Sequence, residues 1–482
     1  MRRWIVATFV VGCGGDASSD KSDVDVDADA DSDADADSDA DADADADADS
    51  DADTDLTGTG ETGQLPPITV TDVTWRLHDS LETLAYVGWT QDGTGAVKVE
   101  YSVDPGIWRS TPEVVRDAGS REQILLGIPY DTSVDYRVLT GGVVVSEGTL
   151  ETGPVPAGLP IPTLELEDPS RQYTDGAYLL TSVDEDTGGW YGTAFWTVIL
   201  DRQGRTVWAR RASDWTLFAQ VSSSTGAELL IDLDTMWTDF DGGNGSRVLR
   251  MTLDEELGET PTPGLLHAFV ERPDGTLAWG SVAHSSTGES LVELAPGAAD
   301  ATVLWACEDD RDIPDDCSHN GLFYDPVSDS YLYSFWNYDT VVAIDRPTGS
   351  LSWYAGGVSG GLDFDPPASQ FELQHGVSYT DAGTLLLSTE VPGPTTHARE
   401  YRVDLAAGAL VEVWSFDAGV YALYNGDARR LPNGNTLHVV GNAAVIFEVT
   451  DDLTEVWKVD YHADRLLGHG EFLTDLYALV RD

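Results

Sequence analysis

A phrase of two strands and a turn recurs along the chain after about residue 155. Each copy has an alternating strand, a turn with Asp or Gly, and a second strand that ends in tryptophan. The tryptophans are Trp208, Trp305, Trp353, Trp414 and Trp457. The interval between the first two is twice the usual one, and "VLRMTLDEELGE" fills its middle without a tryptophan. Six units spaced about 43 to 61 residues apart result. This period is typical of four-stranded blades, so residues 154–482 are predicted to form a six-bladed β-propeller.

A second element recurs between these phrases, and several copies begin with or near histidine. The copies are "HAFVERPDGTLAW", "HNGLFYDPVSDSYLYS", "QHGVSYTDAGTLLLS" and "GDARRLPNGNTLHVV". The innermost strand of each propeller blade lines the central channel. His267, His319 and His375 are therefore predicted to face one another, although they lie far apart in the sequence. Converging imidazoles supply metal ligands, nucleophiles or acid and base groups.

Residues 66–153 are predicted to form a small β-domain ahead of the propeller. Short alternating runs such as "ITVTDVTWRL", "LAYVGWT" and "VKVEYSVD" are separated by turn residues. The stretch "PYDTSVDYRVLTGGVVVSEGTLETG" resembles the end of a fibronectin type III domain, where a tyrosine-rich strand precedes a final hairpin. A fibronectin III-like β-sandwich is therefore expected, and the fold class of the whole chain is all-β.

The first 65 residues are predicted to contain a targeting signal and a disordered linker. Two arginines, the short apolar run "IVATFVV" and the ending "VVGC" resemble a bacterial lipoprotein signal over residues 1–13, with lipid attached to Cys13. An unusually short ordinary signal peptide and a wrong start codon are the alternatives. Residues 14–65 are an Asp/Ala-rich linker that cannot assemble an apolar face, so disorder is expected. The protein is then an exported lipoprotein, on the periplasmic or cell-surface side of an outer membrane.

The formal charge of −59 excludes one large class of partner. Removing residues 16–55, which hold 19 Asp and one Lys, still leaves about −41. Such a field repels DNA, RNA and anionic lipid, so no nucleic-acid partner is predicted. The ordinary explanation of the charge is solubility or a salty habitat.

Cys307 and Cys317 are the cysteines outside the signal. In an exported protein they are expected to form a disulfide across "CEDDRDIPDDC", with two free thiols as the alternative. His319 is near, but no second CxxC or HxxxH motif accompanies it, so no metal site and no cofactor are predicted.

The propeller region, over roughly residues 160–470, resembles the bacterial arylsulfate sulfotransferases. The resemblance is carried by "LHAFVERPDGTLAW", "FELQHGVSYTDAGTLLL", "HAREYRVDL" and "GDARRLPNGNTLHVVGN". The QH pair followed by a strand and a DxG turn is its most specific motif. The resemblance implies a sandwich-like domain before a six-bladed propeller. It also implies an enzyme that moves a sulfuryl group from an aryl sulfate donor to a phenolic acceptor through a sulfo-histidine.

The resemblance assigns roles to residues one by one. His375 is the nucleophile of the QH motif, His267 is a second catalytic histidine, and Asn320 touches sulfate oxygens. The family shows His-x-Asn in the blade of Asn320, whereas this chain reads "SHN". Ser318 then occupies the histidine position, and His319 is shifted by one residue, which in a strand turns the side chain to the other face.

The family also places an arginine near Trp336, and no Arg stands there. We therefore expect Ser318 and Trp336 to lie among the substrate-binding residues without an arginine clamp at that point. Arg399 and Arg429 are the candidates to compensate for it.

Two other interpretations stay open. In the first, the propeller is catalytically inactive and acts as a surface-anchored binding or adhesion module, with Trp336, Trp353 and Tyr354 as a stacking surface. In the second, the three histidines hold a metal ion in a metalloenzyme, although no acidic partner has convincing ligand spacing.

Overall fold

The computed structural model describes residues 68–481 apart from 186–192, 240, 391–394 and 463–464. The predicted lipid-attachment residue Cys13, the signal and the Asp-rich linker lie outside the described residues. Within them every regular element is a β-strand or a single 3-10 turn, which confirms the all-β class. The 3-10 turns are η1 (Val282–His284), η2 (Cys307–Asp309), η3 (Trp336–Tyr338), η4 (Pro367–Ser369), η5 (Gly441–Ala443) and η6 (Tyr477–Leu479).

The first two sheets along the chain are antiparallel, and they share one core. One has the order β1-β2-β6, and the other β4-β3-β7-β8 with β5 paired to β3. Val87 and Trp89 of the first sheet pack with Val99 and Tyr136 of the second. Alternation of buried and partly buried residues, as in β2, gives each sheet its buried face. The strands are β1 (Val70–Leu77), β2 (Ala85–Gln91), β3 (Gly95–Asp104), β4 (Ile107–Ser110), β5 (Val114–Arg116), β6 (Gly119–Leu125), β7 (Ser133–Thr140) and β8 (Val143–Glu151).

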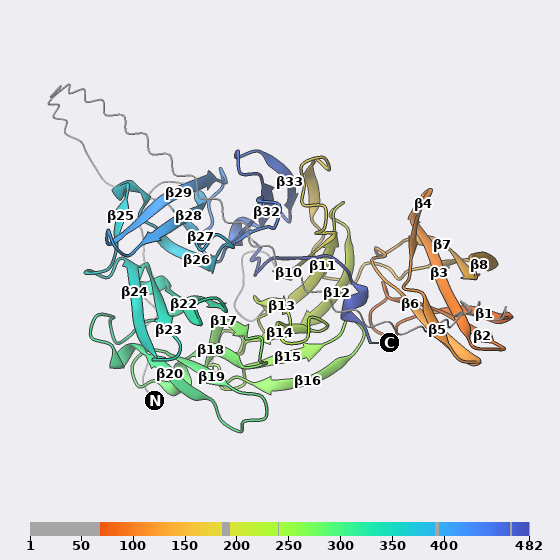
Figure 1. Ribbon diagram of the computed structural model, residues 1–482, viewed down its shortest axis with the longest axis horizontal. Coiled ribbons are helices and arrows are strands. Elements are labelled where there is room, and N and C mark those ends of the chain that lie inside the picture. Colours follow the sequence, from red (N-terminus) through yellow and green to blue (C-terminus); the bar gives the residue numbers. More distant parts are fainter. Residues whose placement is uncertain (1–67, 186–192, 240, 391–394, 463–464, 482) are drawn as a thin grey trace, which may run out of the picture. The chain divides into compact units, whose positions relative to one another are not determined.

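Six further sheets follow, with their outer strands at the periphery and their inner strands near a common centre (Figure 1). The first is closed by the far end of the chain, because β34 pairs with β10. Written from the outer to the inner strand, the first three sheets are β12 (Thr206–Ala212), β11 (Phe195–Asp201), β10 (Tyr178–Asp184) and β34 (Glu471–Leu473); β16 (Glu256–Pro261), β15 (Arg247–Met251), β14 (Leu229–Leu233) and β13 (Ala219–Val221); and β20 (Thr302–Ala306), β19 (Ser290–Leu294), β18 (Leu277–Ser281) and β17 (Leu265–Glu271).

The last three sheets complete a β-propeller arrangement. The final one gains an outer strand from the start of the region, because β9 pairs with β33. The two ends of this region thus each add a strand to a sheet formed mainly by the other end. Written in the same direction, these sheets are β24 (Ser350–Gly356), β23 (Thr340–Asp345), β22 (Ser330–Phe335) and β21 (His319–Asp325); β25 (Asp363–Asp365), β29 (Ala409–Asp417), β28 (Thr396–Asp404), β27 (Leu385–Glu390) and β26 (Glu372–Tyr379); and β9 (Thr163–Glu167), β33 (Glu455–Asp460), β32 (Val445–Val449), β31 (Thr436–Val440) and β30 (Asp427–Arg430).

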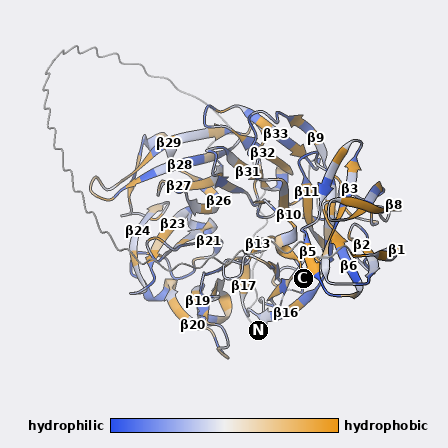
Figure 2. Ribbon diagram, turned by 45° about the vertical axis from the view of Figure 1, so that its right-hand side comes forward, coloured by the Kyte–Doolittle hydropathy of each residue, from blue (hydrophilic) through white to orange (hydrophobic). Residues whose placement is uncertain are grey.

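The tryptophan phrases of the sequence occupy the third and fourth strands of these sheets, counted from the innermost strand. Trp208 lies on β12, Trp305 on β20 and Trp457 on β33, all of them buried between sheets. The phrase without a tryptophan covers β15 and β16. A register shift recurs in each of these strand pairs, as between Ile199 and Leu200, and such bulges strengthen the local twist. Hydrophobic and hydrophilic residues interleave along the strands (Figure 2).

Candidate active site

The structure brings the three predicted catalytic histidines together. They lie on neighbouring innermost strands, His267 on β17, His319 on β21 and His375 on β26. The ring centroids of His267 and His319 are 6.4 Å apart with the planes at 83°. Burial, helped by the nearby His319 and His375, lowers the pKa of His267 to about 3. The three rings therefore share one region, but their bonding differs from one ring to the next.

The Nε2 atom of His375 has no hydrogen-bond partner among the described residues. Its Nδ1 lies 2.9 Å from the carbonyl oxygen of Leu373, and a carbonyl only accepts, so Nδ1 carries the proton and Nε2 keeps its lone pair. No other described residue forms a hydrogen bond with this ring. Burial lowers the pKa of His375 to about 4, so the imidazole is neutral at physiological pH. This is the state in which an imidazole nitrogen is nucleophilic.

The backbone around His375 departs from regular strand geometry. The β26–β27 register shifts on both sides of the pair His375 and Ser388. Leu373 has φ 47° and Gly376 has φ 58°, both in the left-handed region. A Cβ on Gly376 would meet the Cα of Asp427 at 2.4 Å, so glycine is required by both conformation and space. The bulges are therefore the local feature that sets the direction of the His375 ring.

Gln374 and Asn320 hold this bulged backbone in place. The Gln374 side chain is fully buried and donates from Nε2 to Ser334 Oγ at 2.9 Å and to the Phe335 carbonyl at 3.0 Å. Asn320 Nδ2 donates to the carbonyl of Gln374 at 2.7 Å, and its Oδ1 accepts from Ser334 Oγ at 2.9 Å. Both ends of the Asn320 amide are thus used within the protein. These contacts support the backbone beside His375, and the substrate-binding role expected of Asn320 stays a prediction.

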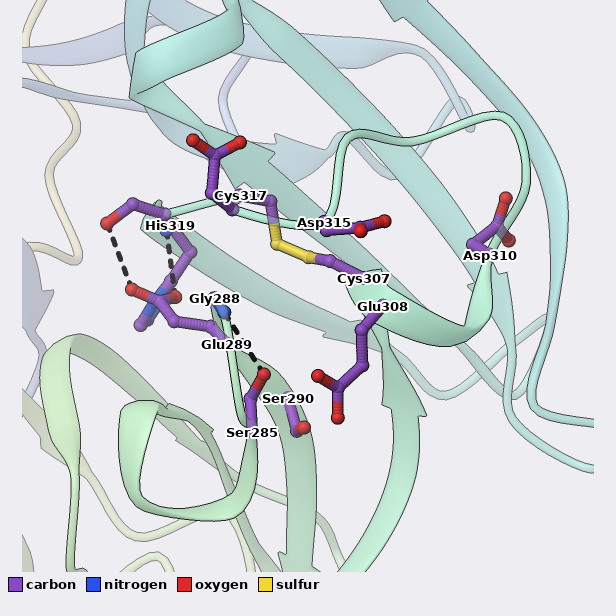
Figure 3. Close-up of a disulfide and its surroundings, with 12 residues drawn as sticks. Ser285, Gly288, Glu289, Ser290, Cys307, Glu308, Asp310, Asp315, Cys317 and His319 are labelled. Carbon is purple, nitrogen blue, oxygen red and sulfur yellow. Dashed lines mark hydrogen bonds and ion pairs between the residues drawn. A yellow bond between two sulfur atoms is a disulfide. The ribbon is translucent and has the colours of Figure 1, made fainter.

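His319 is in contact with other residues through both of its ring nitrogens. Its Nδ1 lies 2.6 Å from Glu289 Oε2 and its Nε2 lies 3.4 Å from the Ala268 carbonyl, so both nitrogens face acceptors. The ring is fully buried and stacks on Tyr333 with centroids 4.9 Å apart. Figure 3 shows the side chain pointing toward Glu289, with both the ring and the backbone N–H of His319 near the carboxylate. The structure therefore places the His319 ring in contacts between two sheets, and the catalytic role predicted for His319 stays a prediction.

Ser318, predicted to bind substrate, is also bonded to Glu289. Ser318 Oγ donates to Glu289 Oε1 at 2.9 Å, and Tyr333 Oη donates to Oε2 at 3.2 Å. Trp336 is 45% exposed, and its backbone N–H donates to the Ser318 carbonyl at 3.1 Å. The Glu289 carboxylate is therefore the centre of a buried network. Sequence reasoning missed it, because nothing local distinguishes "GES" from other turns.

A disulfide stands next to this network. The structure joins Cys307 to Cys317, the pairing that the sequence analysis expects, and both residues are buried (Figure 3). Cys317 lies two residues before His319 and Cys307 begins η2, directly after β20. The bridge therefore ties the start of β21 to the preceding sheet, beside Glu289. It constrains the segment that positions His319.

His267 is anchored by a carboxylate that the sequence did not reveal. Its φ is 67°, and its backbone N–H bonds to the buried Asp234, whose pKa burial raises to about 7. No described residue bonds to His267 Nδ1. Its ring meets Trp237 edge-on, with centroids 6.3 Å apart. His267 is thus a neutral ring held by its backbone, with Nδ1 left unpartnered.

The two candidate compensating arginines lie in different surroundings. Arg399 is buried on β28, and its Nε lies 3.4 Å from Glu412. Arg429, on β30, lines a cavity of about 370 Å³ between the innermost strands, and its Nε lies 3.2 Å from Asp427. None of the three predicted catalytic histidines lines this cavity. A nucleophilic nitrogen needs a lone pair that no hydrogen bond occupies, and the bonding of His375 leaves one. We therefore take His375, and not the cavity, as the centre of the candidate active site.

Within residues 68–481 and their stated gaps, no group of three His, Cys, Asp or Glu side chains is placed to hold a metal ion. In the same residues, no helix is long and apolar enough to cross a bilayer.

No family model and no curated protein matches the sequence. Solved structures do match by shape. A putative 6-phosphogluconolactonase from Bacteroides uniformis aligns with a TM-score of 0.39 and 12% identity, covering 79% of this chain and 100% of that one. The β-propeller domain of Cps50 (Swd1) from Myceliophteria thermophila aligns with a TM-score of 0.37 and 12% identity, covering 62% and 86%. A Bacteroides caccae protein of unknown function aligns with a TM-score of 0.39 and 15% identity, covering 58% and 92%.

Proposed function

We propose that this protein is an arylsulfate sulfotransferase-like enzyme with His375 as its nucleophile. One observation carries the proposal: His375 Nδ1 donates to the Leu373 carbonyl at 2.9 Å, which leaves the Nε2 lone pair free. The lowered pKa of His375, caused by burial, keeps that lone pair unprotonated at neutral pH. The donor is an aryl sulfate and the acceptor is a phenol, as the resemblance of the QH motif implies. No cofactor takes part in the proposed reaction.

The proposed reaction has two balanced halves. Nε2 first attacks the sulfur of the aryl sulfate, an N–S bond forms, and the S–O bond to the ring breaks with its electrons leaving on the aryloxide. A phenol oxygen then attacks the same sulfur, the N–S bond breaks, and its electron pair returns to Nε2 while the phenol proton passes to solvent. His267, neutral because burial lowers its pKa to about 3, has one N–H that can donate to a sulfuryl oxygen.

Finer features of the architecture belong to the same proposal. The six sheets after Thr163 support a six-bladed propeller, and the two sheets that share a core before Glu151 support a fibronectin III-like sandwich. The run before Cys13 supports lipid attachment to that residue. The enzyme would then work outside the cytoplasm, tethered to an outer membrane on its periplasmic or cell-surface side.

The test follows 4-nitrophenol release from 4-nitrophenyl sulfate by the purified full chain, with and without phenol. Release that depends on phenol, together with a sulfuryl adduct found by mass spectrometry on the peptide containing His375, is the expected result. Release without phenol would assign a sulfatase. An adduct on another residue, or no release by a folded wild-type chain, would contradict the proposal.

A second candidate function is a binding or adhesion module without catalysis. It is favoured by one observation, the exposure of aromatic side chains: Trp336 is 45% exposed and Tyr421 is 45% exposed. Trp353, a second member of the expected stacking surface, is instead only 8% exposed and packs in a core. A folded but inactive wild type whose ligand binding is lost in Trp336→Ala would favour this function.

A further inference from the structure

The cavity of about 370 Å³ is lined by later parts of the innermost strands than those that carry the histidines. On β17 the chain passes His267 before it reaches Phe269, which lines the cavity. On β21 it passes His319 before Phe323. No residue of β26, the strand that carries His375, lines it. The cavity wall therefore does not include the proposed nucleophile.

Aromatic and ionisable side chains share the wall of this cavity. Phe218, Phe269 and Phe323 contribute rings, and Arg429 and His469 contribute charged or titratable groups. A cavity of this volume that combines apolar surface with converging polar groups is typical of a site for a small molecule. The ionisable groups then decide what chemistry the site supports.

His469 is the oriented base of the cavity. Its Nδ1 lies 2.7 Å from Oδ2 of the buried Asp427, which also accepts the Gly470 backbone N–H at 3.3 Å. A carboxylate only accepts, so in the neutral ring Nδ1 carries the proton and Nε2 keeps its lone pair. The ring stacks on Phe218, with centroids 6.1 Å apart and planes at 15°. No described residue bonds to Nε2, so a carboxylate-oriented imidazole keeps one nitrogen free, as a general base requires.

Asp427 holds a cation as well as the base. Arg429 Nε lies 3.2 Å from Asp427 Oδ1. Burial opposes ionisation, but the charges of Arg429 and His469 lower the pKa of Asp427 to about 2. In the described part of the chain, no residue accepts a hydrogen bond from the Arg429 Nη atoms. These atoms are donors suited to an oxyanion that develops beside His469.

The two other carboxyl groups of the wall make an anionic ligand unfavourable. Glu271 forms an ion pair with Arg250 and accepts from Ser222 Oγ at 2.6 Å. Glu471 Oε2 accepts the Val221 backbone N–H at 3.0 Å, and burial raises the pKa of Glu471 toward the neutral form. The whole chain carries a formal charge of −59. Such a field repels anions, so the cavity favours a neutral ligand.

We propose that this cavity is a hydrolytic site for a small neutral carboxylic ester, with His469 as general base and Arg429 as oxyanion donor. Nε2 takes a proton from water as the water oxygen bonds to the carbonyl carbon, and the carbonyl electrons move to the oxygen that faces Arg429. The oxyanion then collapses, the bond to the alcohol oxygen breaks, and the alkoxide takes the proton from His469. The products are a carboxylic acid and an alcohol, and the reaction is separate from the transfer proposed for His375.

The test follows acid release from methyl phenylacetate by the purified full chain in a pH-stat. The ring of this neutral ester suits the aromatic wall, and methoxide is a leaving group that a free imidazole does not displace. His469→Gln is expected to lower kcat/KM about a hundredfold or more, the usual contribution of a general base. His462→Gln is the matched control, since the His462 side chain is 66% exposed, and should keep the wild-type rate. The anionic analogue methyl 4-carboxyphenylacetate is expected to react at least about tenfold more slowly.

Arg429→Gln provides a second test that does not depend on the folding of His469→Gln. It is expected to lower kcat about tenfold or more and to change KM less than about twofold, because the oxyanion exists only in the transition state. Four outcomes would overturn the proposal: no acid release by the folded wild type above the rate in buffer, a wild-type rate in folded His469→Gln, an unchanged kcat in Arg429→Gln, or loss of release in His375→Ala. Ester hydrolysis by a chain that fails the aryl sulfate assay would reject the function proposed for His375 and leave this proposal standing.

Discussion

The starts of β21 and β26 carry the same residue type at the same level of neighbouring sheets, yet the two histidines are bonded in opposite ways. His319 is fully buried, with Glu289 on Nδ1 and a carbonyl opposite Nε2. His375 uses Nδ1 on the carbonyl of Leu373, two residues back, and keeps Nε2 free. The difference lies in what the adjacent sheet supplies: a carboxylate reaches His319, whereas a bulge turns His375 away from such a partner. A histidine on an inner strand is reactive only where its neighbours leave one nitrogen unused.

The largest expected effect is the loss of transfer activity when His375 is replaced. His375→Ala is predicted to lower the rate of sulfuryl transfer at least about a thousandfold, because no nucleophile remains. His462→Ala is the matched control, since the His462 side chain is 66% exposed, and its rate should match that of the wild type. Steady-state release of 4-nitrophenol measures both. A wild-type rate in His375→Ala would contradict the nucleophile role proposed for His375.

The next effect concerns stability. His319→Ala is predicted to lower the free energy of unfolding by about 3–5 kcal/mol, because it removes a fully buried ring stacked on Tyr333 and one of the hydrogen-bond partners of the buried Glu289 carboxylate. Denaturant unfolding measures the change. The exposed pair of Arg76 and Glu122 provides the control, and Glu122→Gln should cost less than about 1 kcal/mol. A His319→Ala chain of normal stability but no activity would return His319 to the catalytic group.

The pH dependence sharpens the comparison further. Burial lowers the pKa of His375 to about 4, below the ordinary value of about 6.5. The nucleophile is therefore unprotonated above pH 5, and the transfer rate is predicted to stay level from pH 8 to pH 5. It should fall about tenfold per pH unit below 4, as Nε2 takes up a proton. An inflection near pH 6.5 in the pH–rate profile would contradict the lowered pKa of His375, provided that the inflection is absent from a His375 variant.

The smallest effect concerns Ser318. Ser318→Ala removes one hydrogen bond to Glu289 and is predicted to cost about 1 kcal/mol of stability without changing the transfer rate. Thermal unfolding and the release assay are run on the same sample. A lower rate at unchanged stability would instead indicate that Ser318 touches the substrate, as the family resemblance implies.

Several features could be predicted from the sequence because they are local and repeated. The strand phrases that end in tryptophan lie on outer strands of the sheets, and the phrase without tryptophan occupies β15 and β16. The histidine-led phrases occupy the inner strands of three sheets. The roles of Asn320 and Ser318 could not be predicted this way, since their partners Gln374 and Glu289 come from neighbouring sheets, 54 and 29 residues away in the chain.

The sequence by itself determined that the chain folds into sheets and that His267, His319 and His375 come to the inner strands, because period-two alternation and turn residues act over a few positions. Only the tertiary structure decided which nitrogen is free. That outcome depends on Glu289 reaching His319, on Asp234 holding the His267 backbone, and on bulges around His375. These contacts include ones between segments distant in sequence, and a single hydrogen bond among them decides whether a ring nitrogen stays without a partner.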